Sequence, residues 1–210
     1  MSLLIKVCGL KNPENIAEIA GLYPDYMGFI FFEGSKRKAE IRMIKNSLDN
    51  IPNSIKKVGV FVNESEPEIL RIATELSLDC IQLHGNESPQ LGNTLKNSKL
   101  EVWKVFGLRS LAPNWNLMKD WISSCDAFLF DTSSAQHGGT GQKFDHQLLK
   151  TYPFEKPFWL SGGIGPDFLT LPKFLTGLPF LGLDINSKFE IEPGFKDLLV
   201  VKEFIKHWKY

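Results

Sequence analysis

A cysteine and an aspartate stand at the ends of two apolar runs that are far apart in the chain. Cys8 follows the run Leu3–Val7 and directly precedes Gly9. Asp131 follows the run Ala127–Phe130. If both runs are strands of one parallel barrel, the thiol and the carboxyl group meet at its carboxyl-terminal mouth. A thiolate can remove a proton and a carboxylic acid can supply one, so the two residues are a candidate general base and general acid.

The composition excludes several classes of partner. The chain has 210 residues, and its 24 basic and 24 acidic residues leave a formal net charge of zero. This balance gives no electrostatic support for binding to nucleic acid or to a membrane surface. No stretch approaches the roughly 18 apolar residues that span a bilayer, and the N-terminus lacks the pattern of a signal peptide. The three cysteines, at positions 8, 80 and 125, have neither zinc nor redox spacing, so we expect a cytoplasmic protein with free thiols.

Short apolar runs alternate with amphipathic segments of helical length along the whole chain. The expected strands are Leu3–Val7, Tyr26–Phe31, Lys57–Val62, Cys80–Leu83, Glu101–Phe106, Ala127–Phe130, Phe158–Leu160 and Phe180–Leu183. The expected helices are Pro13–Leu22, Pro67–Leu76, Pro89–Lys96, Trp115–Ile122, Asp145–Thr151, Asp167–Leu175 and Lys196–Lys209, with one more between Arg37 and Asn50. Eight such units predict a single α/β domain, a closed (β/α)8 barrel over residues 1–210. A doubly wound open sheet is the alternative, but it usually has fewer strands at this length.

Three loops at the expected strand ends suit a phosphate group. Gly162 and Gly163 follow the seventh strand, and glycines let backbone N–H groups approach an anion closely. Asp184, Asn186 and Ser187 follow the eighth strand, where a short helix would point its N-terminus at the same place. Barrels often bind phosphate with these two loops. A third loop, Gly138-Gly139-Thr140-Gly141, follows the sixth strand and is flexible enough to close over a ligand.

Arg37 lies in a basic loop after the second strand. Its guanidinium could clamp a substrate carboxylate with two parallel hydrogen bonds, although a solvated basic loop is the alternative on local sequence. Of the four histidines, only His84 falls at a strand end, in the run Gln82-Leu83-His84-Gly85. Since the histidines do not form a metal set, we expect no bound metal.

Several short motifs occur in a fixed order along the chain. They are Lys6-Val7-Cys8-Gly9-Leu10, Met27-Gly28-Phe29-Ile30-Phe31, Ser35-Lys36-Arg37, Val58-Gly59-Val60-Phe61-Val62, Gln82-Leu83-His84-Gly85, Asp131 with Gly138-Gly139-Thr140-Gly141, Phe144-Asp145, and Leu160-Ser161-Gly162-Gly163. In this combination the chain, from Leu4 to about Asp197, resembles phosphoribosylanthranilate isomerases, (β/α)8 enzymes of tryptophan biosynthesis.

The resemblance implies a reaction and a role for each motif. The reaction is the Amadori rearrangement of N-(5-phosphoribosyl)anthranilate to 1-(2-carboxyphenylamino)-1-deoxyribulose 5-phosphate, an aldose–ketose isomerisation without metal or organic cofactor. Asp131 is then the general acid that opens the ribose ring, and Cys8 is the general base that removes the C2 proton. Arg37 would hold the anthranilate carboxylate. The substrate-binding residues so implied are Arg37, Gln82, His84, Gly139, Gly141, Gly162, Gly163, Asp184, Asn186 and Ser187.

This chemistry requires shifted pKa values. An ordinary aspartate has a pKa of about 3.9 and an ordinary thiol one of about 8.5, so at pH 7 neither group is in its working form. We expect desolvation to raise the pKa of Asp131, and neighbours such as Asp184 or Lys104 to tune the pair. The chain departs from the family pattern at Lys188, where a small residue is usual, and Lys188 would add positive charge near the phosphate.

Three other functions stay open at this point. One is a different sugar-phosphate isomerase or epimerase, and a second is a phosphate-binding barrel that has lost catalysis. The third is a broader isomerase that also accepts the aminoaldose of histidine biosynthesis, which carries two phosphates. In each case the partner is a small molecule, with no nucleic acid or membrane, and we expect a monomer, with a homodimer as the alternative.

Overall fold

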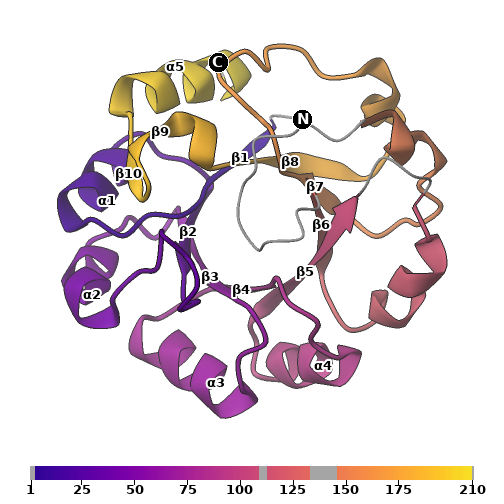
Figure 1. The fold of residues 1–210 in the computed structure, drawn as a ribbon, viewed down its shortest axis with the longest axis horizontal. Coiled ribbons are helices and arrows are strands. Elements are labelled where there is room, and N and C mark those ends of the chain that lie inside the picture. Colours follow the sequence, from indigo (N-terminus) through magenta and orange to yellow (C-terminus); the bar gives the residue numbers. More distant parts are fainter. Residues whose placement is uncertain (1–2, 109–112, 133–145, 210) are drawn as a thin grey trace.

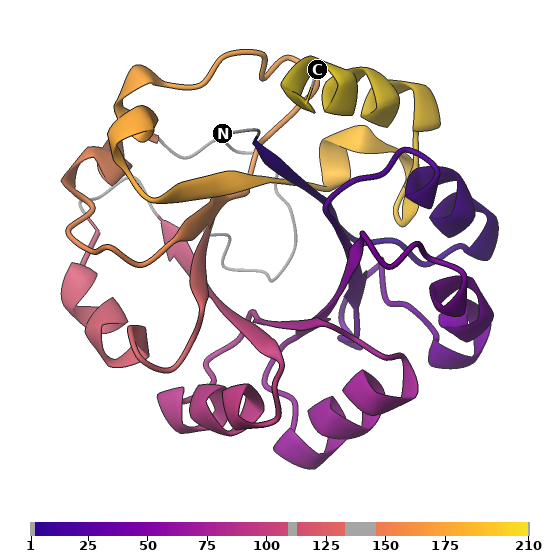
Figure 2. The same cartoon turned by 180° about the vertical axis from the view of Figure 1, so that it is seen from behind.

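Eight parallel strands form a closed barrel in the computed structural model, which describes residues 3–108, 113–132 and 146–209 (Figures 1 and 2). The strands are β1 Leu4–Val7, β2 Tyr26–Ile30, β3 Lys56–Phe61, β4 Cys80–Leu83, β5 Glu101–Leu108, β6 Ala127–Thr132, β7 Phe158–Leu160 and β8 Phe180–Ile185. Each pairs with the next in chain order, and β8 pairs with β1. The predicted (β/α)8 barrel is therefore confirmed, and the open sheet is excluded.

Helices surround the barrel in both views of the ribbon. The α-helices of the described residues are α1 Pro13–Ala20, α2 Ile41–Asp49, α3 Glu66–Glu75, α4 Pro89–Asn97 and α5 Leu198–Lys209. Proline stands in the first turn of α1, α3 and α4, where its fixed φ and its missing N–H cost nothing. In the part of the chain that the structure describes, no helix is both long and apolar enough to span a bilayer.

Between β5 and β8 the helices differ from the prediction. This part of the chain forms short 3-10 helices, η1 Trp115–Trp121, η2 His146–Thr151 and η3 Lys173–Gly177. The helix expected over Asp167–Leu175 is wrong for its first six residues. Pro166 precedes that stretch and Pro172 ends it, and proline both lacks an N–H and keeps the preceding residue out of helical geometry.

The C-terminal helix begins later than expected because a small hairpin precedes it. β9 Glu190–Glu192 pairs antiparallel with β10 Phe195–Lys196, so Lys196 belongs to a strand and not to the helix predicted over Lys196–Lys209. The hairpin follows a short 3-10 helix, η4 Ser187–Phe189, at the end of β8. These elements place the segment after β8 beside α1 and α5 (Figure 1).

The barrel interior and its outer surface are packed separately. Three aromatic rings, from Tyr26, Trp103 and Trp159, fill the interior with centroids 4.8–5.1 Å apart. The larger cluster lies between the strands and the surrounding helices. Cys80 and Cys125 are fully buried, as expected for core thiols. A rigid, packed interior of this kind holds the strand ends in fixed relative positions.

Truncation of Phe158 tests the outer core. This fully buried ring on β7 packs against Phe130 and Tyr152, with centroids 5.3 and 4.9 Å away. We expect Phe158→Ala to lower the free energy of unfolding by about 3–5 kcal/mol in urea denaturation, because the change leaves a cavity. Leu169→Ala, at a residue that is 49% exposed, is the control and should change it by less than about 0.5 kcal/mol. Equal effects of the two substitutions would contradict the packing described.

Candidate active site

The mouth of the barrel is built around the short segment that follows β1. Cys8 comes directly after the strand, is 3% exposed, and donates its backbone N–H to Ile185 O. Gly9 has φ +78°, and a Cβ there would lie 2.6 Å from Asn186 Oδ1 and 2.9 Å from Arg37 Cδ. Only glycine meets both conditions. Arg37 and Asn186 thereby lie against Gly9, the residue that follows Cys8.

A buried lysine lies beneath the thiol. Lys6 Nζ is 2.9 Å from Asp184 Oδ1 and donates a 2.7 Å hydrogen bond to Gln82 Oε1, and its side chain is fully buried. Ser161 Oγ donates to Asp184 Oδ2 at 3.1 Å. The sequence predicted that Asp184 would follow the eighth strand, but it lies within β8. Gln82 and Asp184 therefore belong to a buried polar layer under the mouth, and their contact with a substrate stays a prediction.

The charges around Cys8 act on its pKa in opposite directions. Burial raises the pKa of the thiol, whereas the positive charge and hydrogen bond of Lys6 and the charge of Lys196 lower it. Asp184 raises it further, and the net pKa lies above its ordinary value. Burial by itself would lower the pKa of Lys6, but Asp184 and Cys8 reverse this, so Lys6 is charged at neutral pH. Asp184 was expected to influence the pair, and Lys6 was not.

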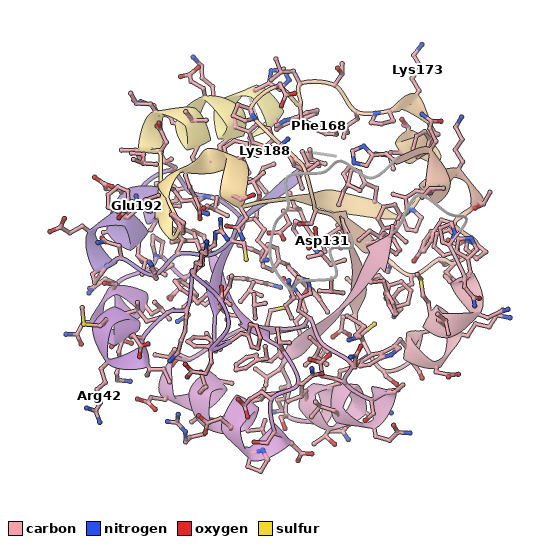
Figure 3. The ribbon with its side chains drawn as sticks, viewed as in Figure 1. Arg42, Asp131, Phe168, Lys173, Lys188 and Glu192 are labelled. Atoms are coloured by element: carbon pink, nitrogen blue, oxygen red, sulfur yellow. The ribbon has the colours of Figure 1, made fainter. Side chains whose placement is uncertain are left out.

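The candidate acid stands on β6 and faces the opening. Asp131 is labelled near the centre of the mouth in Figure 3, and its Oδ2 is 3.6 Å from His84 Nε2. His84, predicted as a substrate-binding residue, is thus a neighbour of the proposed acid. Lys104, the other expected neighbour, instead bonds Glu87 Oε2 at 2.7 Å, and burial lowers the pKa of its ammonium group.

Arg37 is paired with an acidic residue that the sequence reasoning missed. Its Nε is 2.9 Å from both carboxylate oxygens of Glu190, and its Nη2 is 2.7 Å from Oε2. Glu190 Oε1 also accepts a 2.7 Å hydrogen bond from the buried Lys196, which donates another to Asn186 Oδ1. Both missed residues flank Pro193-Gly194, a dipeptide that marks turns and could have predicted the hairpin.

The two predicted phosphate loops lie side by side at the ends of β7 and β8. Gly162 and Gly163 have φ of +67° and +72°, conformations that other residues rarely adopt. η4 follows Asn186, where a short helix was predicted. Gly139 and Gly141 lie outside the described residues. Among residues 3–108, 113–132 and 146–209, no group of three His, Cys, Asp or Glu side chains could hold a metal ion.

Lys188 joins the two loops. Its Nζ donates a 3.0 Å hydrogen bond to Gly163 O, and its Cδ would be 2.9 Å from a Cβ on Gly165. Figure 3 shows Lys188 at the rim of the mouth. A cation therefore stands at the loop where the sequence predicts a phosphate.

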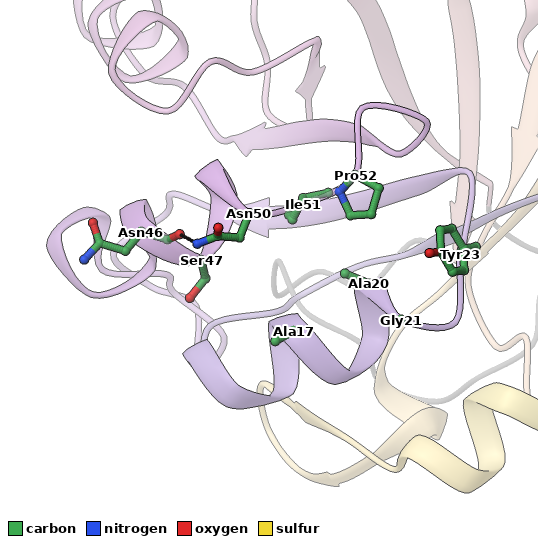
Figure 4. A pocket seen from close by; sticks show the side chains of 9 residues that line it. All are labelled: Ala17, Ala20, Gly21, Tyr23, Asn46, Ser47, Asn50, Ile51 and Pro52. Atoms are coloured by element: carbon green, nitrogen blue, oxygen red, sulfur yellow. Dashed lines mark hydrogen bonds between the residues drawn. The ribbon is translucent and has the colours of Figure 1, made fainter.

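A surface hollow is lined by a different set of residues (Figure 4). It is lined by Ala17, Ala20, Gly21, Tyr23, Asn46, Ser47, Asn50, Ile51 and Pro52. These residues belong to α1, α2 and the segments that lead into β2 and β3. In (β/α)8 barrels that end serves stability, and chemistry takes place at the other.

Comparison with known proteins gives a consistent result. The family described as N-(5'phosphoribosyl)anthranilate (PRA) isomerase matches residues 5–207. An N-(5'-phosphoribosyl)anthranilate isomerase of Parabacteroides distasonis is 40% identical over 97% of this chain and 92% of the relative. One from Caldanaerobacter subterraneus subsp. tengcongensis is 37% identical over 96% of each chain.

Solved structures agree with the sequence relatives. The crystal structure of phosphoribosyl anthranilate isomerase from Thermotoga maritima matches with a TM-score of 0.86 and 30% identity, over 99% of this chain and 98% of that one. A second isomerase structure, with a TM-score of 0.79 and 28% identity over 99% and 98%, is a complex with reduced 1-(o-carboxyphenylamino)-1-deoxyribulose 5-phosphate. From the matched residues and the identity over nearly the whole chain, we conclude that this chain belongs to the phosphoribosylanthranilate isomerase family.

Proposed function

We propose that this chain converts N-(5-phosphoribosyl)anthranilate into 1-(2-carboxyphenylamino)-1-deoxyribulose 5-phosphate, a step of tryptophan biosynthesis. The observation that carries the proposal is the grouping at one barrel mouth of a thiol, a carboxyl group and a guanidinium, from Cys8, Asp131 and Arg37. A barrel that has lost catalysis has no need of all three. The substrate is a small molecule, and a cytoplasmic monomer stays the prediction from the sequence.

Ring opening is the first step, and Asp131 is placed to drive it. Its protonated carboxyl group gives a proton to the furanose ring oxygen, and the C1–O bond breaks while the anthranilate nitrogen forms an iminium. A carboxyl group that acts as an acid must hold its proton near neutral pH. His84, 3.6 Å from Asp131 Oδ2, helps to fix the orientation of this carboxyl group.

Removal of the C2 proton is the second step, and Cys8 is the base. Because burial holds the pKa of this thiol above its ordinary value, the thiolate is the minor form before substrate binds. The iminium places a positive charge beside the sulfur, which favours the thiolate and makes the C2 proton more acidic. The resulting enolamine tautomerises to the ketone, so the reaction needs no external oxidant or reductant.

The first test is turnover of freshly made phosphoribosylanthranilate, followed by the loss of its fluorescence. We expect wild-type protein to be active, and Cys8→Ala and Asp131→Asn each to lose about 10²–10⁴ in kcat, the usual contribution of a general acid or base. Cys125→Ala removes a buried thiol on the outer side of the barrel and should keep activity. Activity in both site variants would overturn the mechanism, and an inactive, folded wild type would overturn the proposed function.

The second test concerns the charge beneath the thiol. Since Lys6 lowers the pKa of Cys8 more than Asp184 raises it, removing both charges in Lys6→Met/Asp184→Asn should raise the thiol pKa. The double variant avoids an unpaired buried charge, which alone would cost about 3–5 kcal/mol of stability. The pKa is measured from the ultraviolet absorbance of the thiolate as a function of pH. The absorbance of the same protein with the additional substitution Cys8→Ser is subtracted, so that only the Cys8 signal remains. An unchanged or lower pKa would contradict the assignment.

The third test concerns Lys188 as a phosphate ligand. We expect Lys188→Met to raise the KM for substrate, and the inhibition constant of inorganic phosphate, by about ten- to hundredfold, with kcat little changed, since one charge-assisted contact is lost. Lys173→Met is the matched control, because Lys173 is exposed and points away from the mouth (Figure 3). Unchanged constants would show that Lys188 only connects the two loops.

A further inference from the structure

The Arg37–Glu190 pair raises a question for the proposed function, on which this inference rests. Arg37 is the residue expected to bind the anthranilate carboxylate, yet a protein carboxylate already contacts it through three short bonds. Glu190 could compete with the substrate for the guanidinium, or it could hold the guanidinium in place for the substrate. The geometry of the surrounding hydrogen bonds distinguishes these two roles.

Glu190 takes only one side of the guanidinium. Its oxygens contact Nε and Nη2 of Arg37, the edge nearest the side-chain stem. Within the described residues, Nη1 has no hydrogen-bond partner, and a guanidinium has five N–H donors in a planar fork. The edge formed by Nη1 and the outer N–H of Nη2 can therefore still bind a second carboxylate with two parallel bonds.

Glu190 is itself fixed from behind. Lys196 Nζ and Gly194 N both donate to its Oε1, at 2.7 and 3.1 Å. Lys196 is fully buried and anchored to α1, because Asn15 donates its side-chain amide to Lys196 O and accepts from Lys196 N. Any movement of the Glu190 carboxylate would break its buried hydrogen bonds from Lys196 and Gly194. The carboxylate is therefore fixed, and it holds the guanidinium in one position.

The charges of the cluster are also incomplete without a further anion. Arg37 and Lys196 are cations and Glu190 is an anion, which leaves one positive charge. Burial alone would raise the pKa of Glu190, but its bonds to Arg37 and Lys196 lower it overall, so the carboxylate is ionised at neutral pH. One substrate carboxylate would neutralise the cluster. Arg37 is also held against Gly9, next to the base, so that carboxylate would be bound beside Cys8.

We propose that Glu190 is a positioning residue that holds the Nε edge of Arg37 and so directs the outer edge of the guanidinium at the carboxylate of the substrate. Glu190 itself does not touch the substrate. Lys196, the β9–β10 hairpin and Asn15 serve to fix Glu190.

The experiment compares Glu190→Gln with Glu192→Gln, a control at an exposed residue of the same strand that points outward (Figure 3). Affinity is measured by calorimetry for reduced 1-(2-carboxyphenylamino)-1-deoxyribulose 5-phosphate, for its phenyl counterpart without the carboxylate, and for inorganic phosphate. We expect E190Q to weaken the carboxylated ligand by about ten- to hundredfold, the effect of losing one well-placed charge-assisted contact. Binding of the other two probes, and all binding by E192Q, should stay unchanged.

A double-mutant cycle separates positioning from a general structural role. If Glu190 acts through Arg37, E190Q should have no further effect on carboxylated-ligand affinity in an Arg37→Ala background. Additive losses, or an equal loss for inorganic phosphate, would overturn the proposal. Should E190Q fold poorly in urea denaturation, Glu190→Asp serves instead, since a shorter carboxylate keeps the charge and displaces the guanidinium.

Two further outcomes are decisive in other ways. Tighter binding of the carboxylated ligand by E190Q would show that Glu190 competes with the substrate, and would overturn this inference while leaving the proposed function intact. A wild-type protein that neither turns over phosphoribosylanthranilate nor binds the reduced product would overturn the proposed function, and this inference with it.

Discussion

The ion pair between Lys6 and Asp184 is the constraint on which the mouth of the barrel depends. These two residues are register partners on β1 and β8, the strands whose pairing closes the barrel. A buried lysine and carboxylate tolerate little displacement, because each would otherwise be an uncompensated charge in a packed interior. Hydrogen bonds to Gln82 and from Ser161 extend this constraint to β4 and the end of β7. The thiol of Cys8 is thus supported by a layer that is both rigid and charged.

The two lysines near the thiol are each paired with a carboxylate, and this arrangement bears on how the proposed base can be buried and still ionise. Lys6 is paired with Asp184, and Lys196 with Glu190. Paired in this way, they reduce the effect of burial on the pKa of Cys8 without removing it. Under the proposed mechanism, the positive charge of the iminium would complete the ionisation.

The strand order and the grouping of Cys8, Asp131 and Arg37 could be predicted, because a parallel barrel brings the carboxyl ends of all its strands to one face. The roles of Lys6 and Glu190 could not. In the sequence, Lys6 is a single polar residue within an apolar run. Its side chain points inward because of the register between the barrel strands, and this register cannot be derived from one sequence. Glu190 reaches Arg37 only through a hairpin whose strands are three and two residues long. Pro193-Gly194 marks the turn of this hairpin, but strands that short have no measurable periodicity, so the sequence does not show that Glu190 faces Arg37.

Fixing Arg37 before the substrate arrives has an energetic consequence. Holding a long, rotamer-rich side chain in one geometry costs about 0.5–1.5 kcal/mol, and a flexible arginine would spend that cost from its binding energy. Here the hairpin and Glu190 order the Arg37 side chain during folding, so the entropy cost is offset by buried contacts elsewhere in the protein and not by substrate binding. The bond between guanidinium and carboxylate can then contribute more fully to affinity. In the proposed complex, this bond would also set the aromatic ring at a fixed angle to Cys8, and a small error in that angle would misalign the sulfur with the C2 proton.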